Sequence, residues 1–236
     1  MFFLNTLKKK LIKNRSDLFV FNKPMINKIN LNLSTKNGRV IHKSDVIKLI
    51  GNNNVLMIIV GINGSIYGYM NKYLQIAKRA NEIYGSTVFI FANDLIGWSN
   101  SKEYFNAMLN YIKENMENKS EIKISIFGNS AGGLLSAFYA WEFQEIDKML
   151  LVNPPLNDMW ELSINGLRTF TGCATLVFGQ FDPNCNVSEI FKQSEYLDIF
   201  NKIILVKNAN HEFKGMLEEF VGLPFQYLYN KIEFYV

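Results

Sequence analysis

From residue 55 onward, short apolar runs alternate with longer segments in which apolar residues recur at helical spacing. The runs are brief and rich in β-branched residues, which favours buried strands over helices. The predicted strands cover 55–60, 87–92, 122–127, 148–152, 174–178 and 202–206. The predicted helices cover about 68–83, 101–118, 131–143, 187–198 and 212–220. This alternation predicts the α/β fold class, with a mostly parallel sheet covered by helices on both faces.

The segment before the first of these strands has a different pattern. Residues 28–50 hold two alternating runs on either side of Asn37-Gly38, a dipeptide that favours a tight hairpin turn. We therefore expect an N-terminal antiparallel hairpin that leads into the sheet. No linker divides the 236 residues, so we expect one α/β domain over 1–236.

Composition narrows the class of protein. Apolar residues make up 48% of the chain and charged residues 19%, enough for a sizeable core and against global disorder. The apolar runs are too short to cross a bilayer, and the first 15 residues lack the apolar stretch of a secretory signal. Cys173 and Cys185 are the only cysteines, so we expect no disulfide framework and a cytoplasmic location.

The net charge of +4 is concentrated at one end of the chain. Residues 1–15 carry five basic residues and no acid, and without them the chain holds 20 basic and 21 acidic residues. A nearly neutral body predicts no nucleic-acid partner. Apolar residues alternate with those cations at helical spacing, which fits either a helix on an anionic membrane surface or a solvated or packed N-terminal helix. We favour the second interpretation.

A glycine-rich junction follows the predicted strand at 122–127. Gly128-Asn129-Ser130-Ala131-Gly132 fits the pattern G-x-S-x-G between a strand and a helix, the context in which the motif exposes a nucleophilic serine. Glycines two residues to either side relieve crowding at the sharp turn, and Gly133 lets the helix pack closely on the sheet. The Ala131 N–H at the start of that helix is a candidate oxyanion donor. The alternative is a glycine-rich turn with an idle serine.

Serine at its ordinary pKa is a weak nucleophile and needs a positioned base. The chain has two histidines. His211 follows the last predicted strand and precedes the last helix, where ligands bind in open α/β sheets. His42 lies in the N-terminal hairpin, so we interpret it as a surface or hairpin residue and His211 as the base.

An imidazole base needs a carboxylate that fixes its tautomer and stabilises the imidazolium. Asp182 lies in "GQFDPN", in the loop after the strand at 174–178. Its alternative role is that of a turn residue, because Asp-Pro-Asn favours turns. Asp158, in the loop after the preceding strand, is the second candidate. We favour Asp182.

With these motifs the chain resembles the α/β-hydrolases, over roughly residues 55–220 and in the order Ser, Asp, His. The resemblance implies a Ser130–His211–Asp182 triad for acyl transfer and a second oxyanion donor from the loop after the strand at 55–60. If Gly61 matches the glycine of the family's His-Gly motif, the Ile62 N–H is that donor. The chain has Val60 where that motif usually has histidine, and Asn63 is the alternative donor.

Relatives of this kind often carry a lid between the strands that end near 152 and begin near 174. Here about 153–173 has room only for a short lid or connection of one helix and a loop. Four residues in loops on the carboxyl side are candidates to line a substrate pocket: Trp98, Met159, Trp160 and Phe181. The chain has no metal-ligand spacing, dinucleotide fingerprint or phosphate loop, so we expect no metal and no cofactor.

Three functions fit these residues. The first is a serine hydrolase that cleaves an ester or thioester of a small or acylated substrate through an acyl-enzyme. The second is an acyltransferase that uses the same triad with an alcohol or sugar as acceptor. The third is a non-catalytic binding protein of the same fold, against which the presence of all three triad residue types argues.

Overall fold

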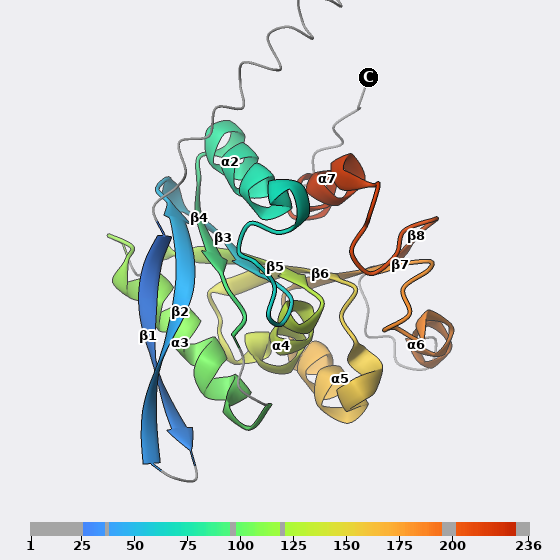
Figure 1. Cartoon of the computed structure of the whole chain (residues 1–236), viewed down its shortest axis with the longest axis horizontal. Coiled ribbons are helices and arrows are strands. Elements are labelled where there is room, and N and C mark those ends of the chain that lie inside the picture. Colours follow the sequence, from blue (N-terminus) through green and yellow to red (C-terminus); the bar gives the residue numbers. More distant parts are fainter. Residues whose placement is uncertain (1–25, 36–37, 95–97, 119–120, 195–201, 230–236) are drawn as a thin grey trace, which may run out of the picture.

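The computed structural model of the chain describes residues 26–35, 38–94, 98–118, 121–194 and 202–229. These residues form one eight-stranded sheet with the order β1-β2-β4-β3-β5-β6-β7-β8 (Figure 1). The strands are β1 (Ile26–Thr35), β2 (Gly38–Leu49), β3 (Asn52–Ile59), β4 (Ser86–Phe91), β5 (Lys123–Asn129), β6 (Ile146–Val152), β7 (Cys173–Gly179) and β8 (Lys202–Val206). The helices are α2 (Lys72–Tyr84), α3 (Ser101–Glu114), α4 (Ala131–Tyr139), α5 (Trp160–Thr169), α6 (Val187–Ser194) and α7 (Leu217–Tyr227).

Strands β3 to β8 pair in parallel with their neighbours, and the β1–β2 hairpin joins β4 in antiparallel fashion. The predicted fold class is confirmed. Helices α2 and α7 cover one face of the sheet, and α3, α4 and α5 cover the other (Figure 1). The carboxyl ends of the parallel strands therefore meet at one edge, where their loops converge.

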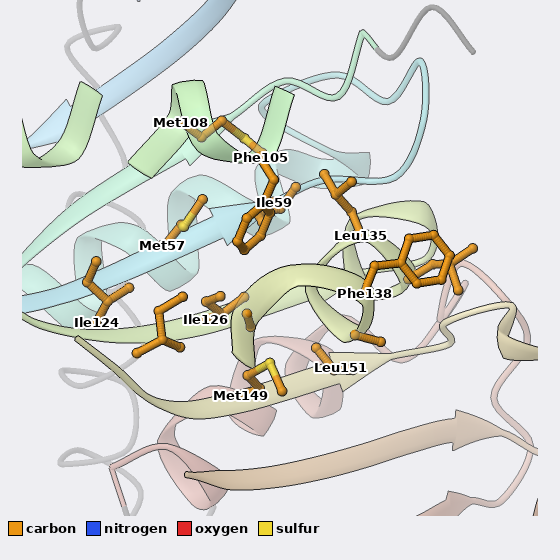
Figure 2. Packing of buried hydrophobic residues seen from close by; sticks show 14 of the residues in the cluster. Met57, Ile59, Phe105, Met108, Ile124, Ile126, Leu135, Phe138, Met149 and Leu151 are labelled. Carbon is orange, nitrogen blue, oxygen red and sulfur yellow. The ribbon is translucent and has the colours of Figure 1, made fainter. Parts of the chain in front are cut away.

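Alternate side chains of the central strands enter two separate cores. Met57 and Ile59 of β3 pack with α3 and α4 (Figure 2), whereas Leu56 and Ile58 pack with α2 and α7. All four side chains are fully buried. Burial on both faces explains why this strand is a continuous apolar run rather than an alternating one.

The N-terminal hairpin extends beyond the sheet (Figure 1). β1 and β2 pair from Ile26↔Ile47 to Thr35↔Gly38, but β2 pairs with β4 only over residues 46–49. This confirms the antiparallel hairpin predicted at 28–50. Its turn at 36–37 and the basic segment 1–15 lie outside the described residues.

The last predicted helix differs from the structure in its bounds. The last helix begins at Leu217, five residues later than predicted, because turns with positive φ at Phe213 and Gly215 delay it. The segment 153–173, expected as a short lid or connection, forms the short 3₁₀ helix η6 (Leu156–Met159) and α5. A Cβ on Gly166 would lie 2.0 Å from the Ala137 carbonyl oxygen, so α5 packs backbone to backbone against α4.

Candidate active site

The junction between β5 and α4 is a strained turn centred on Ser130. Ser130 has φ 53° and ψ −124°, a conformation that L-residues rarely adopt and that clusters at functional sites. Its N–H donates to the Val152 carbonyl at 2.8 Å, which fixes the turn to β6. A Cβ on Gly132 would lie 2.3 Å from the Ile59 carbonyl oxygen, and one on Gly128 would lie 2.7 Å from the Gly133 Cα. The glycines of the motif therefore let α4 start directly against β3 and β5.

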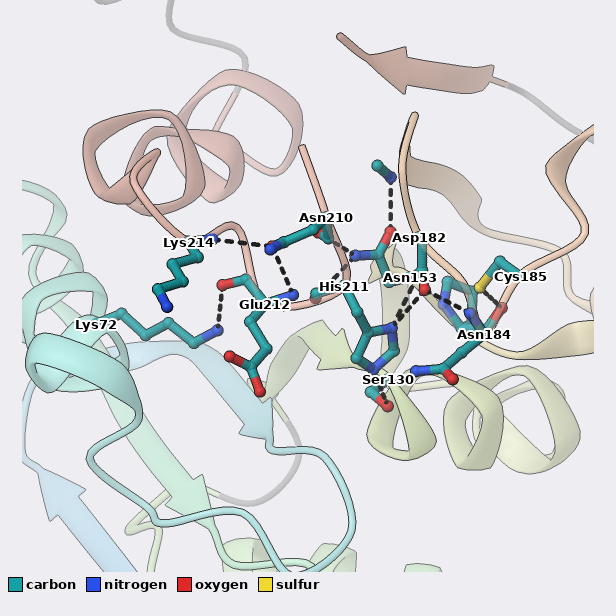
Figure 3. A network of polar contacts seen from close by, with 12 residues as sticks. Lys72, Ser130, Asn153, Asp182, Asn184, Cys185, Asn210, His211, Glu212 and Lys214 are labelled. Atoms are coloured by element: carbon teal, nitrogen blue, oxygen red, sulfur yellow. Dashed lines mark hydrogen bonds and ion pairs between the residues drawn. The ribbon is translucent and has the colours of Figure 1, made fainter. Parts of the chain in front are cut away.

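The structure brings Ser130, His211 and Asp182 into one hydrogen-bonded chain (Figure 3). His211 Nε2 lies 2.9 Å from Ser130 Oγ, and His211 Nδ1 lies 2.9 Å and 2.8 Å from the two Asp182 carboxylate oxygens. An ionised carboxylate only accepts hydrogen bonds, so Nδ1 carries the proton and Nε2 accepts from the serine hydroxyl. This is the tautomer that a general base for Ser130 requires.

The surroundings of Asp182 keep its carboxylate ionised. Its side chain has no exposed surface, and burial alone raises its pKa. The hydrogen bonds from His211 and from the Asn184 N–H outweigh burial and hold the pKa of Asp182 below its ordinary value of 3.8. The buried Cys185 thiol beside it donates to the Pro154 carbonyl at 3.4 Å, and burial, with the nearby Asp182 charge, raises the thiol's own pKa. Asp182 is therefore charged, and Cys185 a neutral donor, at neutral pH.

The loop after β3 lies directly against Ser130. A Cβ on Gly61 would be 3.2 Å from the Ser130 Cβ and 3.6 Å from its Oγ, so a side chain there would crowd the Ser130 side chain. The Asn63 N–H donates to the Asn93 carbonyl at 3.0 Å and is thus already engaged. Ala131 is the first residue of α4, where the N–H has no acceptor within the helix.

Two residues at the start of α2 contact this site, and no sequence motif marks them. The Tyr73 side chain is buried, and burial raises its pKa against the opposing effect of the Gly61 backbone and the Asn129 side chain. Lys72 Nζ lies 3.4 Å from the Glu212 carbonyl oxygen (Figure 3) and 3.9 Å from the Phe220 ring centroid. Burial lowers the pKa of Lys72 from 10.5 to about 8, against the Glu212 charge that raises it.

The remaining sequence candidates are not part of this hydrogen-bonded chain. His42 belongs to β2, paired with Leu31 at the far end of the sheet from β7 and β8. Asp158 is exposed in η6, and the carboxylate bonded to His211 is that of Asp182. The four pocket candidates divide by burial: Trp98, Met159 and Trp160 pack partly buried against the core under α3, α4 and α5, whereas Phe181 is 61% exposed.

The described residues show neither a metal-binding group nor a membrane-spanning helix. No group of three His, Cys, Asp or Glu side chains among them could hold a metal ion. No helix in that part of the chain is both long and apolar enough to pass through a membrane.

No protein-family model and no curated protein matches the chain. Solved structures do match. An alpha-beta serine hydrolase homologue from Coxiella burnetii is similar at 18% identity and a TM-score of 0.62, over 86% of this chain and 96% of that one. Est1E from Butyrivibrio proteoclasticus is similar at 14% identity and a TM-score of 0.65, over 86% of this chain and 98% of that one. A serine hydrolase without lid from Xanthomonas campestris is similar at 17% identity and a TM-score of 0.60, over 87% of this chain and 95% of that one. The chain therefore has the α/β-hydrolase fold.

Proposed function

We propose that the protein is a serine hydrolase that cleaves a carboxylic ester or thioester through an acyl-enzyme. One observation carries the proposal: His211 lies within 2.9 Å of both the Ser130 hydroxyl, on its strained turn, and the Asp182 carboxylate. The names of neighbours such as Est1E and the Pyrococcus furiosus esterase Pf2001 support an ester as the bond cleaved.

Acylation begins at the hydrogen bond between Ser130 and His211. Ser130 Oγ attacks the carbonyl carbon while His211 Nε2 takes the hydroxyl proton, and a tetrahedral oxyanion forms. Asp182 stabilises the imidazolium. The oxyanion collapses, the carbon–oxygen or carbon–sulfur bond breaks, and His211 returns its proton to the departing alcohol or thiol.

Deacylation repeats these steps with water. His211 takes a proton from water, hydroxide adds to the acyl carbon, and the proton passes to Ser130 Oγ as the acid leaves. We assign the oxyanion to the N–H groups of Ala131 and Ile62. Gly61, which precedes Ile62, lies against Ser130, whereas the Asn63 N–H already bonds to Asn93. The loss of one such donor typically costs 10²–10³-fold in rate.

Access of water favours hydrolysis over acyl transfer. The His211 side chain is 22% exposed, and α5, in the segment between β6 and β7, packs on α4. An acyltransferase needs to exclude water from its acyl-enzyme. The strained Ser130 argues against a purely binding role, because such a conformation costs about 1–3 kcal/mol of stability.

Phe181 is the pocket candidate that best fits contact with substrate. It is exposed and adjacent to Asp182, whereas Trp98 packs edge-on against Phe138 in the core. We propose that Phe181 contacts an apolar part of the substrate. Phe181→Ala should then raise KM more for aryl and long-chain esters than for acetyl esters.

The test is to trap the intermediate. p-Nitrophenyl esters and alkyl thioesters of increasing chain length are mixed with the protein, and quenched samples are analysed by intact mass and peptide mapping. We expect an acyl adduct on Ser130 and release of the free acid. With methanol or glycerol present, predominant release of the new ester would identify an acyltransferase. An absence of both turnover and adduct across the series would refute the proposal.

A further inference from the structure

The carboxyl end of β6 holds an asparagine that neither the sequence motifs nor the proposed mechanism uses. Asn153 directly follows β6, is fully buried and has φ 50°. Its N–H donates to the Val177 carbonyl at 2.8 Å, which ties it to β7. We infer that Asn153 is a positioning residue that holds the histidine loop, residues 209–211, in register with the acid loop, residues 180–182.

The Asn153 amide bridges three backbone groups (Figure 3). Its Oδ1 accepts the Gly179 N–H at 2.7 Å, at the base of the acid loop. Its Nδ2 donates to the His211 carbonyl at 2.9 Å and to the Asn210 carbonyl at 3.3 Å. The reversed amide would set oxygen against two carbonyls, so these partners fix its orientation.

Few side chains can replace this amide. The position needs one acceptor and two donors, together with the left-handed conformation that asparagine tolerates better than most residues. Aspartate offers no donor when ionised, and glycine fits the backbone but makes no bond. The histidine loop also runs close to Gly179, where a Cβ would lie 2.7 Å from the Ala209 carbonyl oxygen.

The contact matters because the backbone sets the position of the catalytic ring. The His211 imidazole bonds only to Ser130 and Asp182 among the described residues, and the side chain is partly exposed. Its place relative to Asp182 therefore depends on the two loops being fixed to each other. Asn153 does this together with the bond from the Phe181 N–H to the Ala209 carbonyl at 2.8 Å. A displacement of about 1 Å can lower a rate about 10²-fold.

The experiment compares Asn153→Gly and Asn153→Asp with a matched control. Asn153→Gly removes the amide without strain or charge, and Asn153→Asp keeps the shape but loses both donors. Asn81→Asp is the control, because Asn81 Nδ2 also donates to two backbone carbonyls, those of Ile50 at 2.8 Å and Ser86 at 2.9 Å. These contacts lie at the opposite end of the strands, where β4 begins. Circular dichroism sets a temperature at which every variant is folded.

The first measurement does not depend on activity. The chain has two histidines, so ¹⁵N-histidine labelling gives a simple proton spectrum in which the Nδ1–H bonded to Asp182 resonates far downfield. We expect this proton in wild type and Asn81→Asp, and its loss or broadening in both Asn153 variants. Its persistence unchanged in Asn153→Gly and Asn153→Asp would overturn the inference. So would its absence from wild type, because the inference is built on that hydrogen bond.

The second measurement is the rate at which a fluorophosphonate labels Ser130, and it rests on the proposed function. We expect both Asn153 variants to label about 10²-fold more slowly than wild type, with little change in the concentration for half-maximal rate, and Asn81→Asp to match wild type. Equal rates in all folded variants would overturn the inference. If wild type shows the downfield proton but does not label, the proposed function fails, and the proton alone decides the role of Asn153.

Discussion

The amino and carboxyl ends of the parallel strands differ in which residues adopt a left-handed backbone conformation. At the amino end, where helices lead into strands, the described residue with positive φ is Gly85, which ends α2 at φ 66°. At the carboxyl end, the described residues with positive φ are mostly not glycine. These are Asn63, Met70, Asn71, Ser130, Asn153, Asn208 and Phe213.

The difference shows where the molecule accepts strain. Glycine adopts positive φ freely and asparagine tolerates it, whereas most other residues there cost about 1–3 kcal/mol. At Ser130 and Asn153 the side chain makes contacts that glycine cannot make: one to the base and one to the loop that carries the base. Strain is thus concentrated at the carboxyl end of the strands, where the proposed chemistry occurs. Variants at both ends of the strands test that contrast.

Ser130→Gly should separate activity from stability. Loss of the nucleophile should lower ester turnover by about 10⁵-fold or more. Relief of the strained φ should raise the free energy of unfolding by about 1 kcal/mol, after allowance for glycine's greater flexibility when unfolded. Kinetics and urea denaturation measure the two effects.

The control at the amino end of the strands is Gly85→Ala. It should lose about 1 kcal/mol of stability, because Gly85 has φ 66°. It should keep full activity, because Gly85 lies at the opposite end of the strands from Ser130. If Ser130→Gly proves less stable than wild type, the turn is not strained and the contrast fails.

His211→Ala should lower turnover by several orders of magnitude, because Ser130 then lacks its base. His42→Ala should leave kcat unchanged, since His42 lies in β2, beyond β4 and β3 from Ser130 in the sheet order. Steady-state kinetics on one activated ester decide the matter. The opposite ranking of the two variants would overturn the assignment of the base.

Asp182→Asn should preserve the fold and lower kcat by about 10⁴-fold, the loss that the wrong histidine tautomer causes in a well-studied serine protease. Asp158→Asn should have little effect, because Asp158 is exposed in η6. Kinetics with the melting temperature measured in parallel will distinguish the two. A severe loss in Asp158→Asn with a mild one in Asp182→Asn would show that the acid is Asp158 and not Asp182.

Lys72 should make the free energy of unfolding of the protein depend on pH. Its pKa is lowered by burial to about 8 in the folded protein, against an ordinary value of 10.5. Between these values the unfolded chain binds more protons than the folded one, so stability rises with pH through this window, by about 3 kcal/mol in full. Urea denaturation from pH 7 to 10 measures the rise, which Lys72→Met should remove. An identical pH slope in both proteins would contradict the prediction.

Some residues of the candidate site can be predicted from the sequence, and others cannot. Ser130, Asp182 and His211 each follow a continuous apolar strand, and parallel strands bring their carboxyl ends together, so pattern and motif suffice to select them. Asn153, Tyr73 and Lys72 act through backbone groups or side chains that are remote in the chain, and no local pattern announces such a partner. The packing of the segment 153–173 could not be predicted for a similar reason, because the close contact of Gly166 with α4 joins positions that are remote in the chain.

The central claim is that Ser130 is a nucleophile activated by His211. The most direct measurement is covalent labelling with a fluorophosphonate, followed by intact mass and peptide mapping, on wild type, Ser130→Ala and His211→Ala. We predict one phosphonyl adduct on Ser130 in wild type, none in Ser130→Ala, and labelling slowed by orders of magnitude in His211→Ala. Equal labelling of Ser130→Ala, or a folded wild type that takes no label, would contradict the claim.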